Sequence, residues 1–268
     1  QNHTSHYLLS SLETIPNVVP MSDYQFGKYS EVRIAEIDMD KNKKKNKKKL
    51  KDEEEEITSS YRAYSRIHCS FVFPEEIKRP FPNDLGITEE EEAMFEMVGS
   101  QNDLEITEDV MEVEDLAAQE KKNRLLKMKK YEREKQKTLK KLEENKELYL
   151  TRDEEQGLLQ LSPKYNEVLR NLDLIQGTKF VYTEYRSLEG IAVFSIVLKA
   201  NGYGELTIVK DKDDNLRIKR EPEDAPEGYF ATWIGSDEYS EIIRRVYNND
   251  VSDLPESIKK DFKDMGNT

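Results

Sequence analysis

Two short polar turns in the C-terminal part of the chain carry residue types that can hold phosphate groups. These residues are Tyr185, Arg186 and Ser187 in the first turn and Gly235 and Ser236 in the second. Each turn follows a short apolar segment, at 179–183 or 229–233, and precedes a helical pattern. Free backbone N–H groups at a helix N-terminus favour phosphate, while arginine adds positive charge and tyrosine adds a face for stacking. The pattern therefore predicts two phosphate-binding corners, although an arginine at such a turn can equally be an ordinary surface residue.

An alternation of strand and helix patterns is expected to position these turns. Strands are predicted at 179–183, 204–209 and 229–233, and helices at 163–175, 188–202 and 236–249. Pro163 suits a helix start, and Asn201-Gly202 is typical of a helix end. Strands that alternate with helices indicate a parallel sheet, with ligands beyond the carboxyl ends of its strands. The expected fold class is therefore α/β, a partial parallel sheet with flanking helices, and 210–220 is either a hairpin or a loop.

The N-terminal region is predicted to be helical and partly disordered. A short strand is expected within 7–20, then a helix capped by Ser22 or Asp23, and then a short helix within 59–69. The block of Lys followed by a block of Glu at 41–56 is predicted to be disordered, because like charges repel. It is either a nucleic-acid-binding arm or a flexible insert.

The middle of the chain changes from acidic to basic. Residues 84–118 are strongly acidic and are expected to form a mobile linker with some helix. Residues 119–148 hold good helix formers and neither Gly nor Pro, which predicts one exposed, basic helix. Its apolar residues are too sparse for a sustained coiled-coil seam.

The overall composition limits what the chain can be. Its 268 residues carry a formal net charge of −13, with 36% charged residues and a mean hydropathy of −0.86. This argues against a generally basic nucleic-acid binder but leaves room for a local basic groove. The single cysteine, Cys69, excludes an intramolecular disulfide framework, and no apolar run is long enough to span a bilayer. His68 and Cys69 lack partners at metal-ligand spacing, so no metal site is expected. Trp233 is either a core residue of a strand or part of a stacking surface, and the core is the expectation.

Several segments, in the same order along the chain, resemble the Swi/Snf-like superfamily 2 helicases of giant viruses, the nucleocytoplasmic large DNA viruses. They are MSDYQFGKYSEVR from Met21, YRAYSRIHCSFVFPEEIKRP from Tyr61, SPKYNEVLRNL from Ser162, FVYTEYRSLEGIAVFSIVLKANGY from Phe180 and YFATWIGSDEYSEIIRRVYN from Tyr229. Ser70 stands where that family usually has Asn. The charged stretches between these segments match nothing in the family.

The resemblance implies a domain organisation. Residues 1–83 would be the end of a first RecA-like domain with its helical connector, and 84–118 an acidic linker. Residues 119–160 would carry the exposed charged helix, and 161–268 the first half of a second RecA-like domain. The chain begins with Gln and is expected to be a piece of a longer protein.

The resemblance also implies a function, ATP hydrolysis coupled to movement along DNA. The intact protein would use ATP and Mg²⁺, but this stretch has neither a P-loop nor an acidic pair after an apolar strand, so it alone is expected to bind neither. No catalytic residue is expected here. The residues of the two turns named above would contact the DNA backbone independently of sequence. Viral transcription or replication machinery would be a further partner, in the host cytoplasm or the virion and without a membrane.

The alternative is a non-enzymatic interaction protein that docks through the 119–148 helix and the charged blocks.

Overall fold

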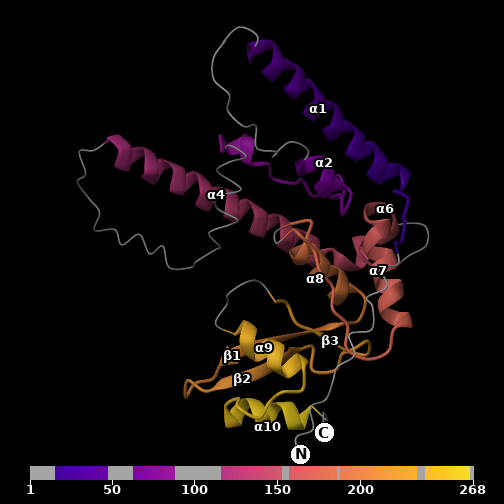
Figure 1. Ribbon diagram of the computed structural model, residues 1–268, viewed down its shortest axis with the longest axis vertical. Helices are drawn as coiled ribbons and strands as arrows, with labels where there is room; N and C mark the ends of the chain where they lie inside the picture. Colours follow the sequence, from indigo (N-terminus) through magenta and orange to yellow (C-terminus); the bar gives the residue numbers. More distant parts are fainter. Residues whose placement is uncertain are drawn as a thin grey trace, which may run out of the picture.

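The computed structural model describes residues 16–47, 63–87, 116–152, 157–185, 188–233 and 239–265 (Figure 1). Its α-helices are α1 (Asp23–Lys47), α2 (Ala63–His68), α4 (Leu116–Glu144), α5 (Lys146–Tyr149), α6 (Leu158–Leu161), α7 (Pro163–Leu174), α8 (Ile191–Ala200), α9 (Ser240–Tyr247) and α10 (Glu256–Asp264), with a 3₁₀ helix η1 (Pro82–Leu85). Its strands are β1 (Gly204–Lys210), β2 (Leu216–Glu221) and β3 (Tyr229–Phe230). The described part of the chain is therefore a mixed α/β protein, which confirms the predicted class.

The sheet is mixed and not parallel throughout, which corrects the sequence prediction. Its strand order is β2-β1-β3, with β2 antiparallel to β1 and β3 parallel to β1. The antiparallel pair is a hairpin, so 210–220 adopts the hairpin of the two alternatives. The Asp211 carboxylate accepts the backbone N–H groups of Asp213 and Asn215 at 2.9 and 3.0 Å, and Asp214 has a φ of 62°. Such local bonds from an aspartate favour a tight turn.

The strand predicted at 179–183 does not form. Residues 178–183 have no regular structure, and Phe180 and Tyr182 are exposed. The segment pairs with none of the three strands, whose order is β2-β1-β3. The predicted strand 229–233 is limited to the two residues of β3, and Trp233 is 51% exposed, not in the core. The strand predicted within 7–20 is absent from 16–20, and its other residues lie outside the described ranges.

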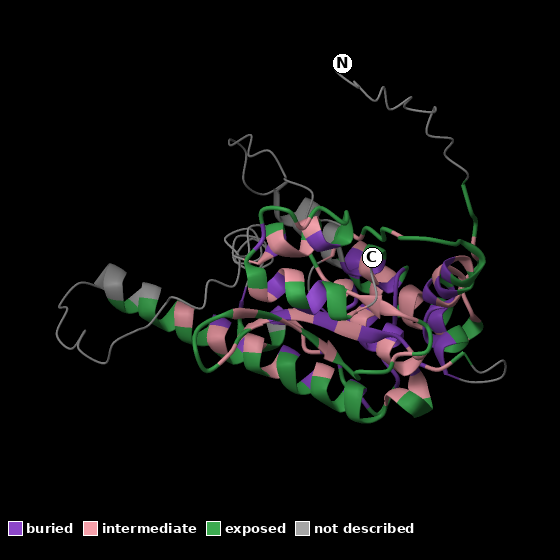
Figure 2. Ribbon diagram, turned by 90° about the horizontal axis from the view of Figure 1, so that it is seen from below, coloured by how far each residue is buried: buried purple, intermediate pink, exposed green. Residues whose placement is uncertain are grey.

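Three buried apolar clusters hold the described elements together, two of them extensive and one small. The buried residues line the inside of the helices and sheet in Figure 2. The larger extensive cluster joins the 71–77 segment, the end of α4, and α6, α7 and α8. The other extensive cluster lies between the β1–β2 hairpin and helices α9 and α10. The larger core thus draws on 71–77, 142–150 and 158–203, which are far apart in sequence.

Both long helices differ from their predictions. α1 continues to Lys47, so the first lysines of the block at 41–56 are helical, while residues 48–56 lie outside the described ranges. The helix predicted at 119–148 is confirmed as α4 and α5, but it is not exposed all round. Met128, Tyr131 and Leu142 are buried, and the first two pack against Ile87 after η1. Among the described helices, none has the length and apolar character needed to cross a membrane.

Candidate nucleic-acid interface

The first predicted corner lies in a tight turn before α8. We call residues 183–190 the Tyr185 turn; residues 186 and 187 within it lie outside the described ranges. The Ile191 N–H donates to the Tyr185 carbonyl at 3.0 Å, which closes the turn. At Gly190 a Cβ atom would overlap the Tyr185 carbonyl. Only glycine therefore allows this close approach of two backbone segments.

A buried ion pair fixes the inner side of the Tyr185 turn. Glu189 is 3% exposed and Arg79 is 8% exposed. The Arg79 guanidinium donates to both carboxylate oxygens of Glu189, through Nε and through Nη2, the latter at 3.3 Å. The same guanidinium lies over the Phe81 ring at 4.7 Å and donates from Nη1 to the Pro80 carbonyl at 2.8 Å. The turn is thereby bound to the proline-rich segment, 110 residues earlier in the chain.

A tyrosine from α7 holds the turn from a second direction. The Tyr165 hydroxyl donates to the Glu189 carbonyl, and it also lies 3.3 Å from the Gly190 carbonyl. Burial raises the pKa of Tyr165 above its ordinary value, so the hydroxyl keeps its proton and remains a donor. Ser162 caps α7 by accepting the Tyr165 N–H at 3.0 Å, which sets the position of the ring.

The outer side of the turn carries an aromatic ring and positive charge. Tyr185 is half-buried, and burial raises its pKa. Arg66 forms an ion pair with Glu184 at 2.7 Å, and both side chains are more than 60% exposed. Burial raises the pKa of the Cys69 thiol, while the positive charges of Lys164 and Arg66 act in the opposite sense. One exposed cation, Arg66, therefore acts on Tyr185, while Lys164 lies near Cys69.

The other predicted contact residues are not placed by the structure. Arg186, Ser187, Gly235 and Ser236 lie outside the described residues. Because 179–183 is not a strand, the sheet does not provide the predicted pair of neighbouring strand ends. Sequence reasoning also missed Arg79, Tyr165 and Glu189. One signal was available: Glu189 interrupts an apolar segment, and a buried carboxylate needs a charged partner.

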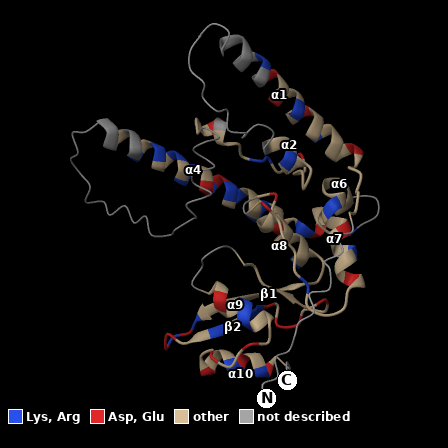
Figure 3. Cartoon of the chain, in the orientation of Figure 1, with Lys and Arg blue, Asp and Glu red and all other residues tan. Residues whose placement is uncertain are grey.

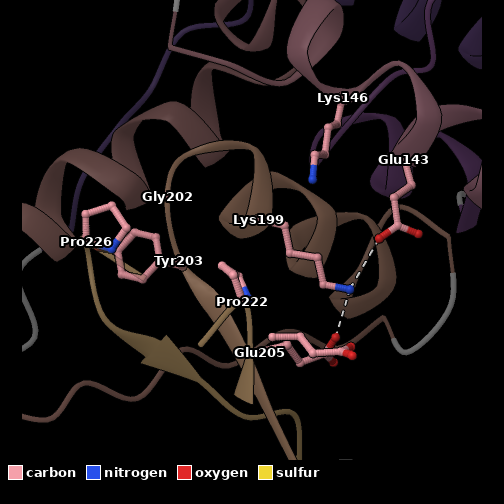
Figure 4. Close-up of a pocket in the computed structure, with 9 residues that line it drawn as sticks. Glu143, Lys146, Lys199, Gly202, Tyr203, Glu205, Pro222 and Pro226 are labelled. Carbon is pink, nitrogen blue, oxygen red and sulfur yellow. Dashed lines mark hydrogen bonds and ion pairs between the residues drawn. The ribbon is translucent and has the colours of Figure 1, made fainter. Parts of the chain in front are cut away.

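The pocket shown in Figure 4 lies where α4, α8 and the sheet meet, and its volume is about 340 Å³. It is lined by Glu143, Lys146, Lys199, Gly202, Tyr203, Glu205, Glu221, Pro222 and Pro226. Lys199 Nζ contacts Glu205 at 2.8 Å and Glu143 at 3.3 Å. Burial lowers the pKa of Lys199, but these two carboxylates raise it, and the net shift is upward.

This pocket does not fit a nucleotide. The positive charge of Lys199 is already compensated, and the Glu221 carboxylate would repel phosphate. Its ion pairs instead link α4 to α8 and β1. Among the described residues, no group of His, Cys, Asp or Glu is arranged to hold a metal ion.

Comparison with known proteins adds no relative: no family model, curated protein or solved structure matches this chain.

Proposed function

We propose that this chain is part of an ATP-dependent DNA helicase or translocase and supplies sequence-independent contacts to the DNA backbone. The contacts come from the Tyr185 turn, and the domain that carries it is the first half of a second RecA-like domain. ATP and Mg²⁺ would be bound by other parts of the intact enzyme, in a giant virus or its host cell. The resemblance of the segments named above to viral superfamily 2 helicases motivates the proposal.

The observation that supports it is the asymmetry of the Tyr185 turn. Its inner side is fixed by the buried Arg79–Glu189 pair and by Tyr165, while its outer side carries Arg66 in an exposed ion pair with Glu184. An exposed pair of this kind can exchange for a phosphate. The described residues of the turn are held in place by these contacts, and a segment that is already fixed loses little conformational entropy when it binds. Cations at such a turn can hold phosphates, and phosphate contacts position a protein on DNA without reading its sequence.

The arrangement of elements is compatible with this assignment. α8 precedes β1, and β3, which is parallel to β1, precedes α9. Helices that alternate with parallel strands are the units from which RecA-like domains are built. The alternation is incomplete in this chain, because β2 and not a helix lies between β1 and β3.

Replacing Arg186 by Ala tests the proposed contact. The variant is expected to bind two unrelated duplexes more weakly by the same factor, because a phosphate contact carries no base information. The slope of log Kd against log salt should fall by roughly one, since one phosphate is no longer neutralised. Fluorescence anisotropy with labelled duplexes over a salt series measures both quantities.

Arg170→Ala is the matched control. Arg170 is an exposed arginine on α7 that pairs with Glu167 at 2.7 Å, so its loss removes the same charge from another surface. It should leave affinity and salt slope close to those of the unchanged chain. The proposed contact is wrong if Arg186→Ala folds normally and binds DNA as the Arg170→Ala control does.

A further inference from the structure

We propose that one face of α4 is a second binding surface for the phosphate backbone of duplex DNA, separate from the Tyr185 turn. This surface, the α4 basic face, consists of Lys122, Lys130, Arg133, Lys137, Lys140 and Lys141. In Figure 3, the cartoon of α4 carries repeated blue segments, which mark Lys and Arg. The proposal does not depend on the Tyr185 turn, because it rests on a different element.

The charge of α4 is opposite in sign to that of the whole chain. The helix holds eleven Lys and Arg residues against five Glu residues, a formal charge of +6, within a chain of net charge −13. At about 100° per residue, the six cations of the α4 basic face fall within a sector of about 100°. The buried Met128, Tyr131 and Leu142 lie on the opposite side. Among the described residues of α4, Glu144 is the one acidic residue in that sector.

Most of these cations are available to a ligand. Lys122, Lys130, Arg133 and Lys141 are exposed and form no ion pair with any residue that the structure describes. Lys137 and Lys140 form surface pairs with Glu134 at 2.7 Å and Glu144 at 4.0 Å. Exposed pairs of this kind contribute at most about 1 kcal/mol, so they can exchange for phosphate.

The opposite face of α4 is held by the rest of the molecule, which leaves the basic face fixed in orientation. Thr138 Oγ1 donates to the Lys78 carbonyl at 3.3 Å, and Leu142 is buried in the larger core. Lys135 belongs to this inner side: it is buried, pairs with Glu132 at 2.7 Å and lies over the Tyr131 ring. It is therefore not part of the proposed surface.

The chemistry of the α4 basic face fits a polyanion better than a folded protein partner. Protein interfaces have a core rich in aromatic and other apolar side chains. Within this sector Leu126 is the one exposed large apolar residue among the described residues of α4. Five of the six cations are lysines, which act as mobile point charges and suit phosphates more than base edges.

The length of the surface also suits DNA. From Lys122 to Lys141 the helix rises about 28 Å, at about 1.5 Å per residue. A duplex carries about one negative charge per 1.7 Å of its axis, so the face can run beside about eight base pairs.

A quadruple substitution tests the surface in the full 268-residue chain. Its members are Lys130→Gln, Arg133→Gln, Lys137→Gln and Lys141→Gln. The salt slope of binding to a duplex of about 30 base pairs should become shallower by about 3–4, since each lost phosphate contact contributes about 0.9. Affinity at about 0.1 M salt should fall at least tenfold. Fluorescence anisotropy gives both values, and circular dichroism checks the fold.

The matched control also removes three lysines and one arginine, but from exposed positions outside α4. Its members are Lys41→Gln, Arg170→Gln, Lys212→Gln and Lys260→Gln. The control should keep a slope within about one unit of the unchanged chain. Equal effects of the two quadruple variants would show that only net charge matters and would overturn the proposal.

Polyglutamate distinguishes an acidic protein partner from DNA. If the α4 variant binds duplex DNA normally but loses binding to polyglutamate, the face recognises acidic peptides and the proposal is wrong. If the quadruple α4 variant loses DNA binding, the α4 basic face is supported. This conclusion holds whether or not Arg186→Ala also weakens binding. The two variants therefore separate the second surface from the Tyr185 turn.

Discussion

Replacing Glu189 by Ala should lower the free energy of unfolding by about 3–5 kcal/mol, because it leaves the buried Arg79 guanidinium without its counter-charge. Arg79 is 8% exposed and cannot regain the lost interaction from water. The free energy of unfolding is measured by urea denaturation followed by circular dichroism. Glu189→Gln keeps the size and part of the hydrogen bonding, so its effect should be smaller.

Glu184→Ala is the control for this experiment. Glu184 also pairs with an arginine, Arg66, at 2.7 Å, but both side chains are largely exposed. Such a pair contributes about 0–1 kcal/mol. Similar small effects of Glu189→Ala and Glu184→Ala would show that the buried pair does not hold the Tyr185 turn.

Gly190→Ala is expected to open the Tyr185 turn and to destabilise the chain by about 1–3 kcal/mol or more. The added Cβ would overlap the Tyr185 carbonyl, which is backbone and cannot rotate away. Relief of the overlap requires the two segments to separate, which breaks the 3.0 Å bond from the Ile191 N–H to Tyr185. The variant should therefore lose both stability, in urea denaturation, and DNA binding.

Gly27→Ala is the control, and in urea denaturation it is expected to raise stability where Gly190→Ala lowers it. Gly27 lies in α1, and nothing lies within 4 Å of a Cβ placed there. Alanine in a helix interior is favoured over glycine by about 0.5–1 kcal/mol, so this variant should be slightly more stable. If Gly190→Ala behaves like Gly27→Ala, the backbone segments at Tyr185 and Gly190 do not approach each other closely.

Helix ends were predictable from the sequence because their signals are local. Pro163 follows the Ser162 cap of α7 as its position predicts. α8 ends at Asn201-Gly202, where Gly202 has a φ of 88° and the Asn201 side chain donates to the Val197 carbonyl at 2.8 Å. Each signal acts within one helical turn, so no knowledge of the rest of the fold is needed.

Strand pairing was less predictable because it depends on neighbours. The apolar segment 179–183 has the composition of a strand, yet it pairs with none of β1, β2 and β3. The contacts that hold the Tyr185 turn were unpredictable for the same reason. Arg79 and Glu189 are separated by 110 residues, and no local pattern connects them. The residues expected to touch DNA came from sequence, whereas the residues that fix their turn came only from the structure.

The most direct test of a DNA-backbone function is the binding of the unchanged chain to two duplexes of equal length and unrelated sequence, over a series of salt concentrations. We expect equal affinities for the two duplexes and a steep loss of binding as salt rises, with a slope that corresponds to several released counterions. A chain that binds neither duplex at low salt, or that strongly prefers one sequence, would contradict the proposed backbone contact.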